Sequence, residues 1–365
     1  MGLRKSTLES VAVNRGFWKG KRVFLTGHTG FKGGWLALWL ANMGAEVHGF
    51  ALSPSTTPNF FAICKIQSHL RSNTIADIRD AETLAKAMRL AKPDIVFHLA
   101  AQPLVRYSYT APVETYAVNV LGTIHLLEAV RHTPSVRAVV NVTTDKCYEN
   151  HGQDKPYCES EALGGHDPYS SSKGCSELIT AAYRRSFLEP AGVQLASARA
   201  GNVIGGGDWA TDRLIPDFLR AFDSGQILIV RSPNATRPWQ HVLEPLSGYL
   251  MLAEKLCTKD SDFDEAWNFG PEESDTRPVR WIIEYLGGQV FGFRWQDDKT
   301  PQLHEAHCLK LDSSKAKARL GWHPRWDLKT ALDKTLAWHK AWKGTADMAK
   351  VSLAQVCEYE TAAKA

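Results

Sequence analysis

A glycine-rich turn constrains the fold of this chain more than any other segment: Gly27-His28-Thr29-Gly30-Phe31-Lys32-Gly33. It follows an apolar run at 22–26 that is typical of a β-strand and opens a helix-like run at 32–43. Glycines let the backbone turn sharply and bring amide groups against a pyrophosphate at the positive end of a helix. A glycine triplet alone also suits an ordinary tight turn, but a strand before it and a helix after it favour a dinucleotide site.

The rest of the first half repeats this alternation of strand and helix. Near-continuous apolar runs predict strands at 22–26, 46–51, 95–100, 138–143 and 194–200. Helical periodicity predicts helices at 32–43, 81–92, 115–131, 170–187 and, late in the chain, 328–342. Strands this apolar are covered by helices on both faces. The pattern therefore predicts an α/β fold with a Rossmann-type, doubly wound parallel sheet.

The composition changes after Asn202, where glycines and prolines cluster around a strand-like run at 227–231. This mix is typical of a smaller lobe built from loops and short elements. We expect the dinucleotide-binding domain at 17–201, with 238–258 returning to it. A substrate-binding lobe is expected at 202–237 and 259–345, and the last residues, 361–365, are expected to fray.

Length and composition exclude several classes of protein. The chain has 365 residues, 44% of them apolar, and its net charge of +4 is spread along the sequence, which disfavours nucleic-acid binding. Seven cysteines without a Cys-x-x-Cys pair disfavour a zinc site and a disulfide framework, so no metal is expected. The first residues lack a signal peptide, and the longest apolar stretch, 35–41, is far shorter than the roughly 20 residues that cross a bilayer. We expect a cytoplasmic protein that does not bind membranes.

A tyrosine and a lysine four residues apart, Tyr169 and Lys173, fall on one face at the start of an expected helix. A neighbouring ammonium stabilises a phenolate and lowers the pKa of the tyrosine, which makes the phenol a usable acid and base for a sugar hydroxyl. The pair is common by chance. Its position after the glycine turn and after the strand that ends in Thr143-Thr144-Asp145-Lys146 favours catalysis.

The order of these motifs resembles the extended short-chain dehydrogenase/reductase family over residues 17–342. Within it the chain is most similar to the nucleotide-sugar 4,6-dehydratases, and among those to the subgroup that acts on CDP-D-glucose in bacterial dideoxysugar (O-antigen, lipopolysaccharide) synthesis. The segments that carry this likeness are 27–33, His98-Leu99-Ala100-Ala101-Gln102-Pro103-Leu104-Val105-Arg106, 144–148, Arg199-Ala200-Gly201-Asn202-Val203-Ile204-Gly205-Gly206-Gly207-Asp208-Trp209 and Arg237-Pro238-Trp239-Gln240-His241-Val242.

The resemblance implies a hydro-lyase in which C4 of the sugar is oxidised, water leaves across C5 and C6, and the hydride returns to C6. Tyr169 would take the C4 hydroxyl proton, Thr144 would bind the same oxygen, and Asp145 would protonate the departing hydroxyl. Lys146 stands where most relatives have glutamate, so it is the candidate for the C5 base. A lysine acts as a base only where burial or nearby positive charge lowers its pKa. A solvated lysine at a strand end is the competing interpretation.

The expected cofactor is NAD rather than NADP, because no arginine follows the second strand to grip a 2′-phosphate. The acidic residue that usually binds the adenosine ribose is also missing there, and either Ser53 or Ser55 is a candidate to replace it. Asp77 is equally compatible with a turn or helix cap. The residues expected to bind NAD are Gly27, His28, Gly30, Phe31, Lys32, Gly33, Asp77, Ile78, Ala100, Ala101, Gln102, Asn119, Tyr169 and Lys173.

The expected substrate, by the same resemblance, is CDP-D-glucose. Its diphosphate suits arginine, which pairs bidentately with phosphate oxygens, although an arginine such as Arg213 also suits a surface ion pair. The residues expected to contact the substrate are Arg106, Asn202, Arg213, Leu214, Arg237 and His241.

Two other functions compete with dehydration. A nucleotide-sugar 4-epimerase shares the glycine turn, the threonine and the Tyr169-Lys173 pair, but it does not need Asp145 and Lys146. A non-catalytic NAD-binding module typically loses the tyrosine or the lysine, and both are present. The family likeness also predicts a homodimer or homotetramer that is built on the helices at 115–131 and 170–187.

Overall fold

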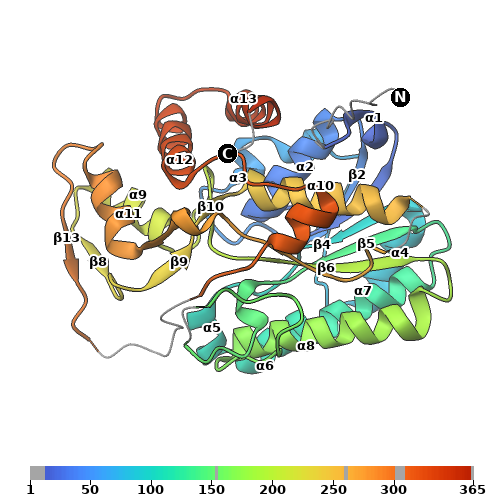
Figure 1. Cartoon of the computed structure of the whole chain (residues 1–365). Coiled ribbons are helices and arrows are strands. Elements are labelled where there is room, and N and C mark those ends of the chain that lie inside the picture. The colour runs from blue at the N-terminus through green and yellow to red at the C-terminus, as the bar shows by residue number, and fades with distance from the viewer. Residues whose placement is uncertain (1–12, 153–154, 259–261, 301–308, 363–365) are drawn as a thin grey trace, which may run out of the picture.

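The computed structural model describes residues 13–152, 155–258, 262–300 and 309–362. Seven parallel strands form its central sheet in the order β11-β6-β5-β4-β1-β2-β3 (Figure 1). The strands are β1 (Arg22–Thr26), β2 (Glu46–Ala51), β3 (Ser72–Ile75), β4 (Ile95–His98), β5 (Ala138–Val142), β6 (Gln194–Ala200) and β11 (Ala266–Phe269). The doubly wound parallel sheet predicted from the sequence is confirmed. The five predicted strands are present, whereas β3 and β11 were not predicted.

Helices cover both faces of the sheet. On one face α2 (Phe31–Asn42) and α10 (Leu243–Cys257) pack into a core with β1, β5 and β6. On the other face α4 (Ala81–Ala91), α7 (Gly122–Arg131) and α8 (Pro168–Tyr183) enclose a second core around Phe24, Leu126 and Leu195. The two cores hold the sheet rigid, so that the loops at the carboxyl ends of its strands have a fixed support.

The helix predicted at 115–131 is interrupted. It is divided into α6 (Pro112–Tyr116), a π-helical turn, η2 (Ala117–Leu121), and α7. The buried Asn119 lies in this turn, where it donates to Ser172 Oγ (2.9 Å) and exchanges two hydrogen bonds with the backbone of Gln102. Single π-helical turns of this kind occur often at functional sites. A second π-helical turn, η4 (Arg184–Leu188), extends α8.

A smaller lobe lies beside the sheet (Figure 1). It has its own core, which includes Phe218, Ile282 and Leu332. Its elements are α9 (Leu214–Ser224), β8 (Leu228–Val230), β9 (Thr236–Pro238), β12 (Thr276–Pro278), α11 (Val279–Gly287) and β13 (Trp295–Asp297), with α12 (Leu328–Lys343) packed on them. The predicted domain boundaries stay a prediction, but β11, inside the segment assigned to this lobe, pairs with β6 in the central sheet.

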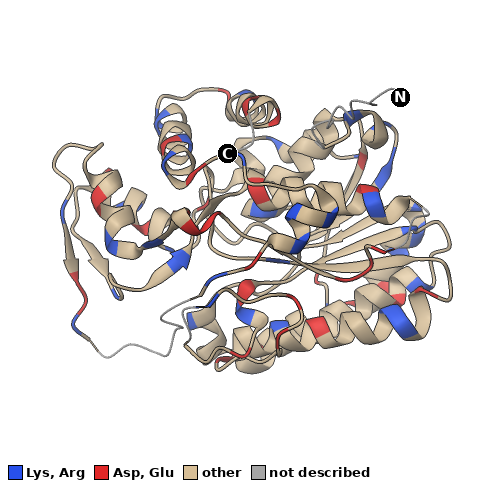
Figure 2. Cartoon of the chain, viewed as in Figure 1, with Lys and Arg blue, Asp and Glu red and all other residues tan. Residues whose placement is uncertain are grey.

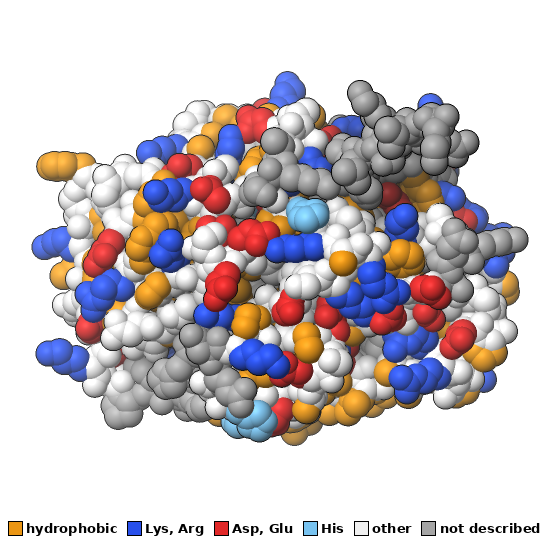
Figure 3. Space-filling model, viewed as in Figure 1, with side chains coloured by type: hydrophobic (Ala, Val, Ile, Leu, Met, Phe, Trp, Pro, Cys, Tyr) orange, Lys and Arg blue, Asp and Glu red, His pale blue; other side chains and the backbone are white. Residues whose placement is uncertain are grey.

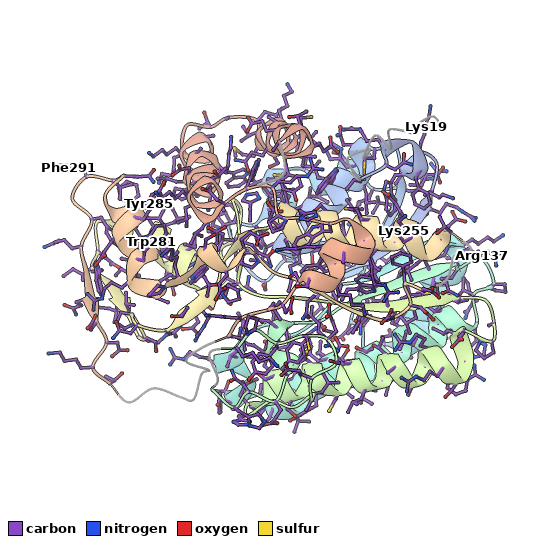
Figure 4. The ribbon with its side chains drawn as sticks, in the orientation of Figure 1. Lys19, Arg137, Lys255, Trp281, Tyr285 and Phe291 are labelled. Carbon is purple, nitrogen blue, oxygen red and sulfur yellow. The ribbon has the colours of Figure 1, made fainter. Side chains whose placement is uncertain are left out.

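Labelled residues mark the two ends of the molecule in Figure 4. Figure 4 shows Phe291 at the outer edge of the smaller lobe, next to the stacked rings of Trp281 and Tyr285 on α11. Lys19 and Arg137 lie at the opposite end, where they precede β1 and β5 (Figure 4). Lys and Arg are interspersed with Asp and Glu over the visible ribbon and surface rather than gathered into one patch (Figures 2 and 3).

The C-terminal segment folds back onto the sheet domain. The predicted helix at 328–342 is confirmed as α12, and a further helix, α13 (Met348–Thr361), was not predicted. α13 packs on α2 and α12, and it includes Thr361, so the expected fraying does not begin there; 363–365 lie outside the described residues.

The remaining elements are α1 (Arg15–Trp18), α3 (Phe60–Ile63), η1 (Ile66–His69), α5 (Val105–Thr110), η3 (Asp145–Cys147), β7 (Val203–Ile204), β10 (Gln240–His241), η5 (Glu273–Asp275) and η6 (Ala316–Leu320). None of the described helices is both long and apolar enough to span a membrane.

Candidate active site

A cavity of about 1280 Å³ opens at the carboxyl ends of the sheet strands and continues into the smaller lobe. Ligands of doubly wound folds bind in this crevice, and the volume exceeds the roughly 300–1,000 Å³ of a pocket for one small molecule. Twenty of the residues predicted to act at the site line it: Gly27, Gly30, Phe31, Lys32, Gly33, Asp77, Ile78, Ala100, Ala101, Gln102, Arg106, Thr144, Asp145, Lys146, Tyr169, Lys173, Asn202, Arg213, Leu214 and Arg237.

The glycine turn forms one end of the cavity. Gly27 has a φ of +77°, and a Cβ placed there would lie 2.8 Å from the backbone nitrogen of Ala100. At Gly33 a Cβ would collide with the carbonyl of Gly27, so the first turn of α2 reaches β1 only because this residue is glycine. The exposed amides of that turn fit a pyrophosphate. Both Ser53 and Ser55 line the cavity beyond β2, so both stay candidates for the adenosine ribose.

The wall that carries the predicted catalytic residues, which we call the catalytic wall, comes from two elements, the end of β5 and the start of α8. The carboxylate of Asp145 is buried, and its Oδ1 accepts a hydrogen bond from Thr144 Oγ1 (3.0 Å). The same oxygen lies 3.5 Å from Lys146 Nζ. Its other oxygen, Oδ2, is buried and has no hydrogen-bond partner among the described residues. A Cβ at Gly201 would approach that oxygen to 2.7 Å, so glycine there keeps space free in front of the carboxylate.

The Tyr169 and Lys173 pair lies where the sequence predicts, on the first turns of α8, which Asp167 caps. Lys173 Nζ donates to the carbonyl of Val142 on β5 (3.2 Å). Burial lowers the pKa of Lys173 to about 8 and raises the pKa of Tyr169 to about 12, and a hydrogen bond with Thr144 offsets only part of the latter shift. The net shift of the Tyr169 pKa is therefore opposite to the expected lowering, because in the chain alone burial of the phenol outweighs the charges and hydrogen bond that favour the phenolate.

Lys32 brings a third ammonium group into the cavity. Its Nζ lies 3.4 Å from the hydroxyl of Tyr249 on α10. Burial, with the positive charges of Arg213 and Lys173, lowers the pKa of Lys32 to about 7. The glycine turn therefore carries a side chain whose charge depends on pH near neutrality.

A buried ion pair supports the catalytic wall from behind. Arg199 on β6 makes a bidentate contact with Glu177 on α8, with distances of 2.9 and 2.8 Å. The same carboxylate accepts hydrogen bonds from Thr143 and Ser197, and Arg199 donates to the hydroxyl of Tyr148 (2.8 Å). The network fixes the residues on both sides of Thr144, Asp145 and Lys146, so it sets where these three side chains lie.

The arm of the cavity in the smaller lobe is rich in arginine. Arg213 pairs with Asp208 (2.8 Å), and Arg237 lies buried nearby. Asp212 has a backbone φ of +61°, and its carboxylate forms ion pairs with Arg231 (N–O distance 2.7 Å) and Arg106 (3.2 Å). The second of these pairs crosses the mouth of the cavity. Sequence reasoning missed Asp208, Asp212 and Arg231, because carboxylates beside arginines give no local signal until the fold brings them together.

Three predicted site residues do not line the cavity. His28 points away from it: its Nε2 donates to Asn73 Oδ1 (2.7 Å), and its ring packs on Phe61 because Gly49 leaves room for it on the β2 side. His241 is fully buried between Trp35 and Trp326, and Asn119 holds the Gln102 loop rather than facing the cavity. Asp77 does line it, although Arg79 pairs with its carboxylate (2.6 Å), so ligand contact and a turn role stay open.

Comparison with known proteins shows relatives along nearly the whole chain. Residues 24–267 match the GDP-mannose 4,6 dehydratase family. A CDP-glucose 4,6-dehydratase of Salmonella typhimurium is 52% identical over 357 residues, which cover 96% of this chain and 99% of that protein. A GDP-mannose 4,6-dehydratase of Vibrio cholerae is 26% identical, covering 83% of this chain and 90% of the relative.

Solved structures share the fold. A dTDP-glucose 4,6-dehydratase of Bacillus anthracis in complex with NAD superposes with a TM-score of 0.73 at 21% identity, covering 90% of this chain and 99% of that one. A UDP-glucose 4-epimerase of Thermotoga maritima gives the same TM-score, 0.73, at 21% identity, with 88% and 99% covered. Dehydratases and epimerases therefore share this architecture, and the side chains at the site must separate the two reactions.

Proposed function

Since the chain belongs to the GDP-mannose 4,6-dehydratase family of nucleotide-sugar enzymes, we propose that it is an NAD-dependent hydro-lyase that converts CDP-D-glucose to CDP-4-keto-6-deoxy-D-glucose. One observation carries the proposal. A Tyr-Lys pair for oxidation and an Asp-Lys pair for elimination line the same wall of one cavity. A 4-epimerase needs only the first pair.

The oxidation half-reaction rests on Tyr169, Thr144 and Lys173. Tyr169 exchanges a proton with the C4 hydroxyl, and Thr144 Oγ1 hydrogen-bonds the same oxygen. Lys173, whose Nζ is fixed by the Val142 carbonyl, is the cation that stabilises negative charge on the phenol. These roles account for the placement of all three side chains along the inner wall of the cavity.

The elimination half-reaction rests on Asp145 and Lys146. Oxidation at C4 acidifies the hydrogen on C5, which Lys146 Nζ removes. The free Oδ2 of Asp145 delivers a proton to the departing C6 hydroxyl, and the space kept open by Gly201 admits that hydroxyl. The 3.5 Å between Lys146 Nζ and Asp145 Oδ1 lets a base and an acid act on adjacent carbons of one sugar.

The glycine turn and its neighbours hold NAD. Gly27, Gly30 and Gly33 place the amides at the start of α2 against the pyrophosphate, and Ala100, Ala101 and Gln102 line the crevice toward the nicotinamide. Bound there, NAD would supply a hydride acceptor for C4 and then a hydride donor for C6, and it would end the cycle oxidised. Ser53 or Ser55 binds the adenosine ribose.

The diphosphate of the substrate lies in the arginine-rich arm. Arg213 and Arg237 supply guanidinium groups, Asn202 supplies an amide, and Leu214 lines the same arm. The choice of a cytidine nucleotide follows the relative from Salmonella typhimurium, which is a CDP-glucose 4,6-dehydratase. The keto-deoxy product is a precursor for bacterial dideoxysugars, and we place the reaction in the cytoplasm, in the supply of O-antigen lipopolysaccharide.

The assembly we propose is a homodimer, with a tetramer as the larger alternative. Apolar side chains are unusually exposed on one face made by α6, η2 and α8: Val113 (81%), Leu121 (50%) and Leu178 (61%). Contiguous exposed apolar side chains mark interaction surfaces. Two copies that pair these helices would cover the face.

Proton and carbon-13 NMR of the purified protein with CDP-D-glucose tests the function, with UDP-, dTDP- and GDP-linked sugars in parallel. We expect a C6 methyl signal and a 4-keto carbon with CDP-D-glucose. Galactose signals would instead indicate a 4-epimerase. No change after NAD is added would contradict the catalytic roles of Asp145 and Lys146.

A further inference from the structure

The arm of the cavity in the smaller lobe must hold the nucleoside of the substrate. The sugar lies at Tyr169, and the glycine turn at the opposite end takes the dinucleotide, so the diphosphate at Arg213 leads the rest of the molecule toward α9 and β8. Ile229 of β8 lines this arm with its side chain 48% exposed, which gives an apolar surface for the face of a planar base. The question is which polar group reads the edge of that base.

Four carboxylates line this arm: Asp208, Asp212, Asp217 and Asp298. Both oxygens of Asp208 are engaged, by the backbone nitrogen of Ala210 (3.0 Å) and by Arg213 (2.8 Å). Asp212 is held by Arg231 and Arg106, at 2.7 and 3.2 Å. Asp298 accepts hydrogen bonds from the backbone nitrogen (2.9 Å) and the hydroxyl (2.7 Å) of Thr300. The contacts of Asp212 and Asp298 all fall on the Oδ1 atoms, but they already compensate Asp212 with two guanidinium groups and tie Asp298 to its own loop. Asp217, with a single arginine partner, is the best placed of the four to accept a further donor.

Asp217, in the first turn of α9, has a free oxygen in a fixed orientation. Its Oδ1 pairs with Arg220, while Oδ2 has no hydrogen-bond partner among the described residues. Arg220 is itself held by the carbonyls of Trp209 (2.9 Å) and Ala210 (3.2 Å), next to the loop that carries Asp208. Because Arg220 is anchored at three acceptors, it fixes the carboxylate that faces the arm.

We propose that Asp217 selects cytosine by accepting a hydrogen bond from the exocyclic amine of the base, with Arg220 as the positioning residue. Cytosine presents an N–H₂ donor at this ring position, whereas uracil and thymine present a carbonyl oxygen. In that case a carbonyl oxygen of the base would face the carboxylate oxygen of Asp217. Both atoms are hydrogen-bond acceptors, so no hydrogen bond would form between them. The inference rests on the proposed function, since it assumes that a pyrimidine nucleotide occupies the arm.

The test measures base selectivity in the full chain with NAD added. Dissociation constants for CDP and UDP are measured by titration calorimetry, together with kcat/KM for CDP-glucose and UDP-glucose. In the wild type CDP binds at least about tenfold more tightly than UDP, the size expected for one charge-assisted hydrogen bond. Asp217→Asn offers an N–H₂ group in the same shape, so it lowers the CDP:UDP selectivity by at least about tenfold, mainly through KM.

The matched control is Asp298→Asn, which removes a charge from the same arm and leaves the CDP:UDP ratio as in the wild type. A ratio within about twofold of wild type in folded Asp217→Asn overturns the proposal and assigns base reading to the backbone of β8. If Asp217→Asn fails to fold, the wild-type protein is tested with a different ligand, the diphosphate of pyrimidin-2-one riboside, which lacks the exocyclic amine. Its dissociation constant is compared with that of CDP. Binding as tight as that of CDP overturns the proposal.

Failure of this inference and failure of the proposed function give different results. A protein that prefers CDP to UDP but makes no C6 methyl group keeps the role of Asp217 and loses the dehydration. A protein that dehydrates CDP-glucose and UDP-glucose equally well keeps the dehydration and loses the role of Asp217.

Discussion

At the scale of single residues, the distinctive feature of this site is a lysine beside a buried carboxylate. Lys146 Nζ lies 3.5 Å from Asp145 Oδ1, at the end of β5, and its side chain is 24% exposed. The geometry supports a role in chemistry over a fully solvated lysine, because Lys146 lines the cavity beside the free oxygen of Asp145 and would act as a base in its neutral amine form. We therefore expect Lys146 to be the C5 base.

Lys146→Met separates the two half-reactions. The variant should still oxidise C4, because Tyr169, Thr144 and Lys173 remain, but it should lose C5 exchange by about 10²–10⁴-fold, the usual contribution of a general base. The measurement is incorporation of deuterium from heavy water at C5, followed by NMR. Lys155→Met, an exposed lysine that pairs with Glu161, is the control and should exchange normally. Undiminished C5 exchange in Lys146→Met would rule out this base.

The sequence identifies the residues of this wall well and the histidines poorly. Tyr169, Lys173, Asp145 and Lys146 belong to contiguous motifs that sit directly at strand ends and helix starts, so their position follows from local structure. His28 and His241 belong to equally contiguous motifs, yet their rings turn into the core. The direction in which a loop side chain points depends on the space that residues distant in the sequence leave for it, as Gly49 does for the ring of His28. The sequence alone does not show that space.

At the scale of elements, α8 and β6 are joined behind the active site by the Glu177 and Arg199 pair. The side chains are only 3% and 4% exposed. Arg199→Met leaves a buried carboxylate without its partner, so the free energy of unfolding should fall by about 3–5 kcal/mol. Denaturant unfolding measures this change. Arg22→Met, which breaks the more exposed pair with Asp94, should cost less than about 1 kcal/mol. Equal losses in the two variants would contradict the supporting role.

The C-terminal helix α13 depends on another buried carboxylate. Tyr359 donates to Glu244 Oε2 (2.6 Å), and the backbone nitrogen of Trp326 donates to Oε1 (2.8 Å). Burial raises the pKa of Glu244 from 4.5 to about 7. The folded chain therefore binds this proton more tightly than the unfolded chain, and the stability that the protonated group contributes is lost as pH rises from about 4.5 through about 7.

Glu244→Gln should remove this pH dependence. The wild type should lose stability relative to the variant by an amount on the order of 3 kcal/mol between about pH 5 and pH 8. Thermal unfolding midpoints of both proteins across that range provide the measurement. Midpoints that run parallel at every pH would show that Glu244 keeps an ordinary pKa in the folded protein.

The elements themselves follow from the sequence where their pattern is local. The strands β1, β2 and β6 have the predicted bounds, because each is a short apolar run between turn residues. β3 is missed because Ser72-Asn73-Thr74-Ile75 is mostly polar and pairs only with β2 at the sheet edge. The π-helical turn at Ala117–Leu121 has no sequence signal in periodicity, since Asn119 distorts the helix to reach Gln102 and Ser172.

At the scale of the whole molecule, the cavity lies between the sheet and a smaller lobe, and the face that we propose for pairing lies elsewhere, on α6, η2 and α8. Leu178→Lys places a charge on that face and should convert the dimer to a monomer, as measured by light scattering after size-exclusion chromatography. Leu90→Lys changes a still more exposed leucine on α4, 75% exposed against 61% for Leu178, and should leave the dimer intact. A dimer that survives Leu178→Lys would place the interface on another surface.

In the proposed reaction one site oxidises C4, eliminates water and returns the same hydride to C6. CDP-D-glucose carrying deuterium at C4 tests this sequence of steps, with the product observed by NMR and mass spectrometry. We expect a 4-keto product whose C6 methyl group holds the deuterium. Deuterium that stays at C4 in a galactose product, or that is lost to water, would contradict it.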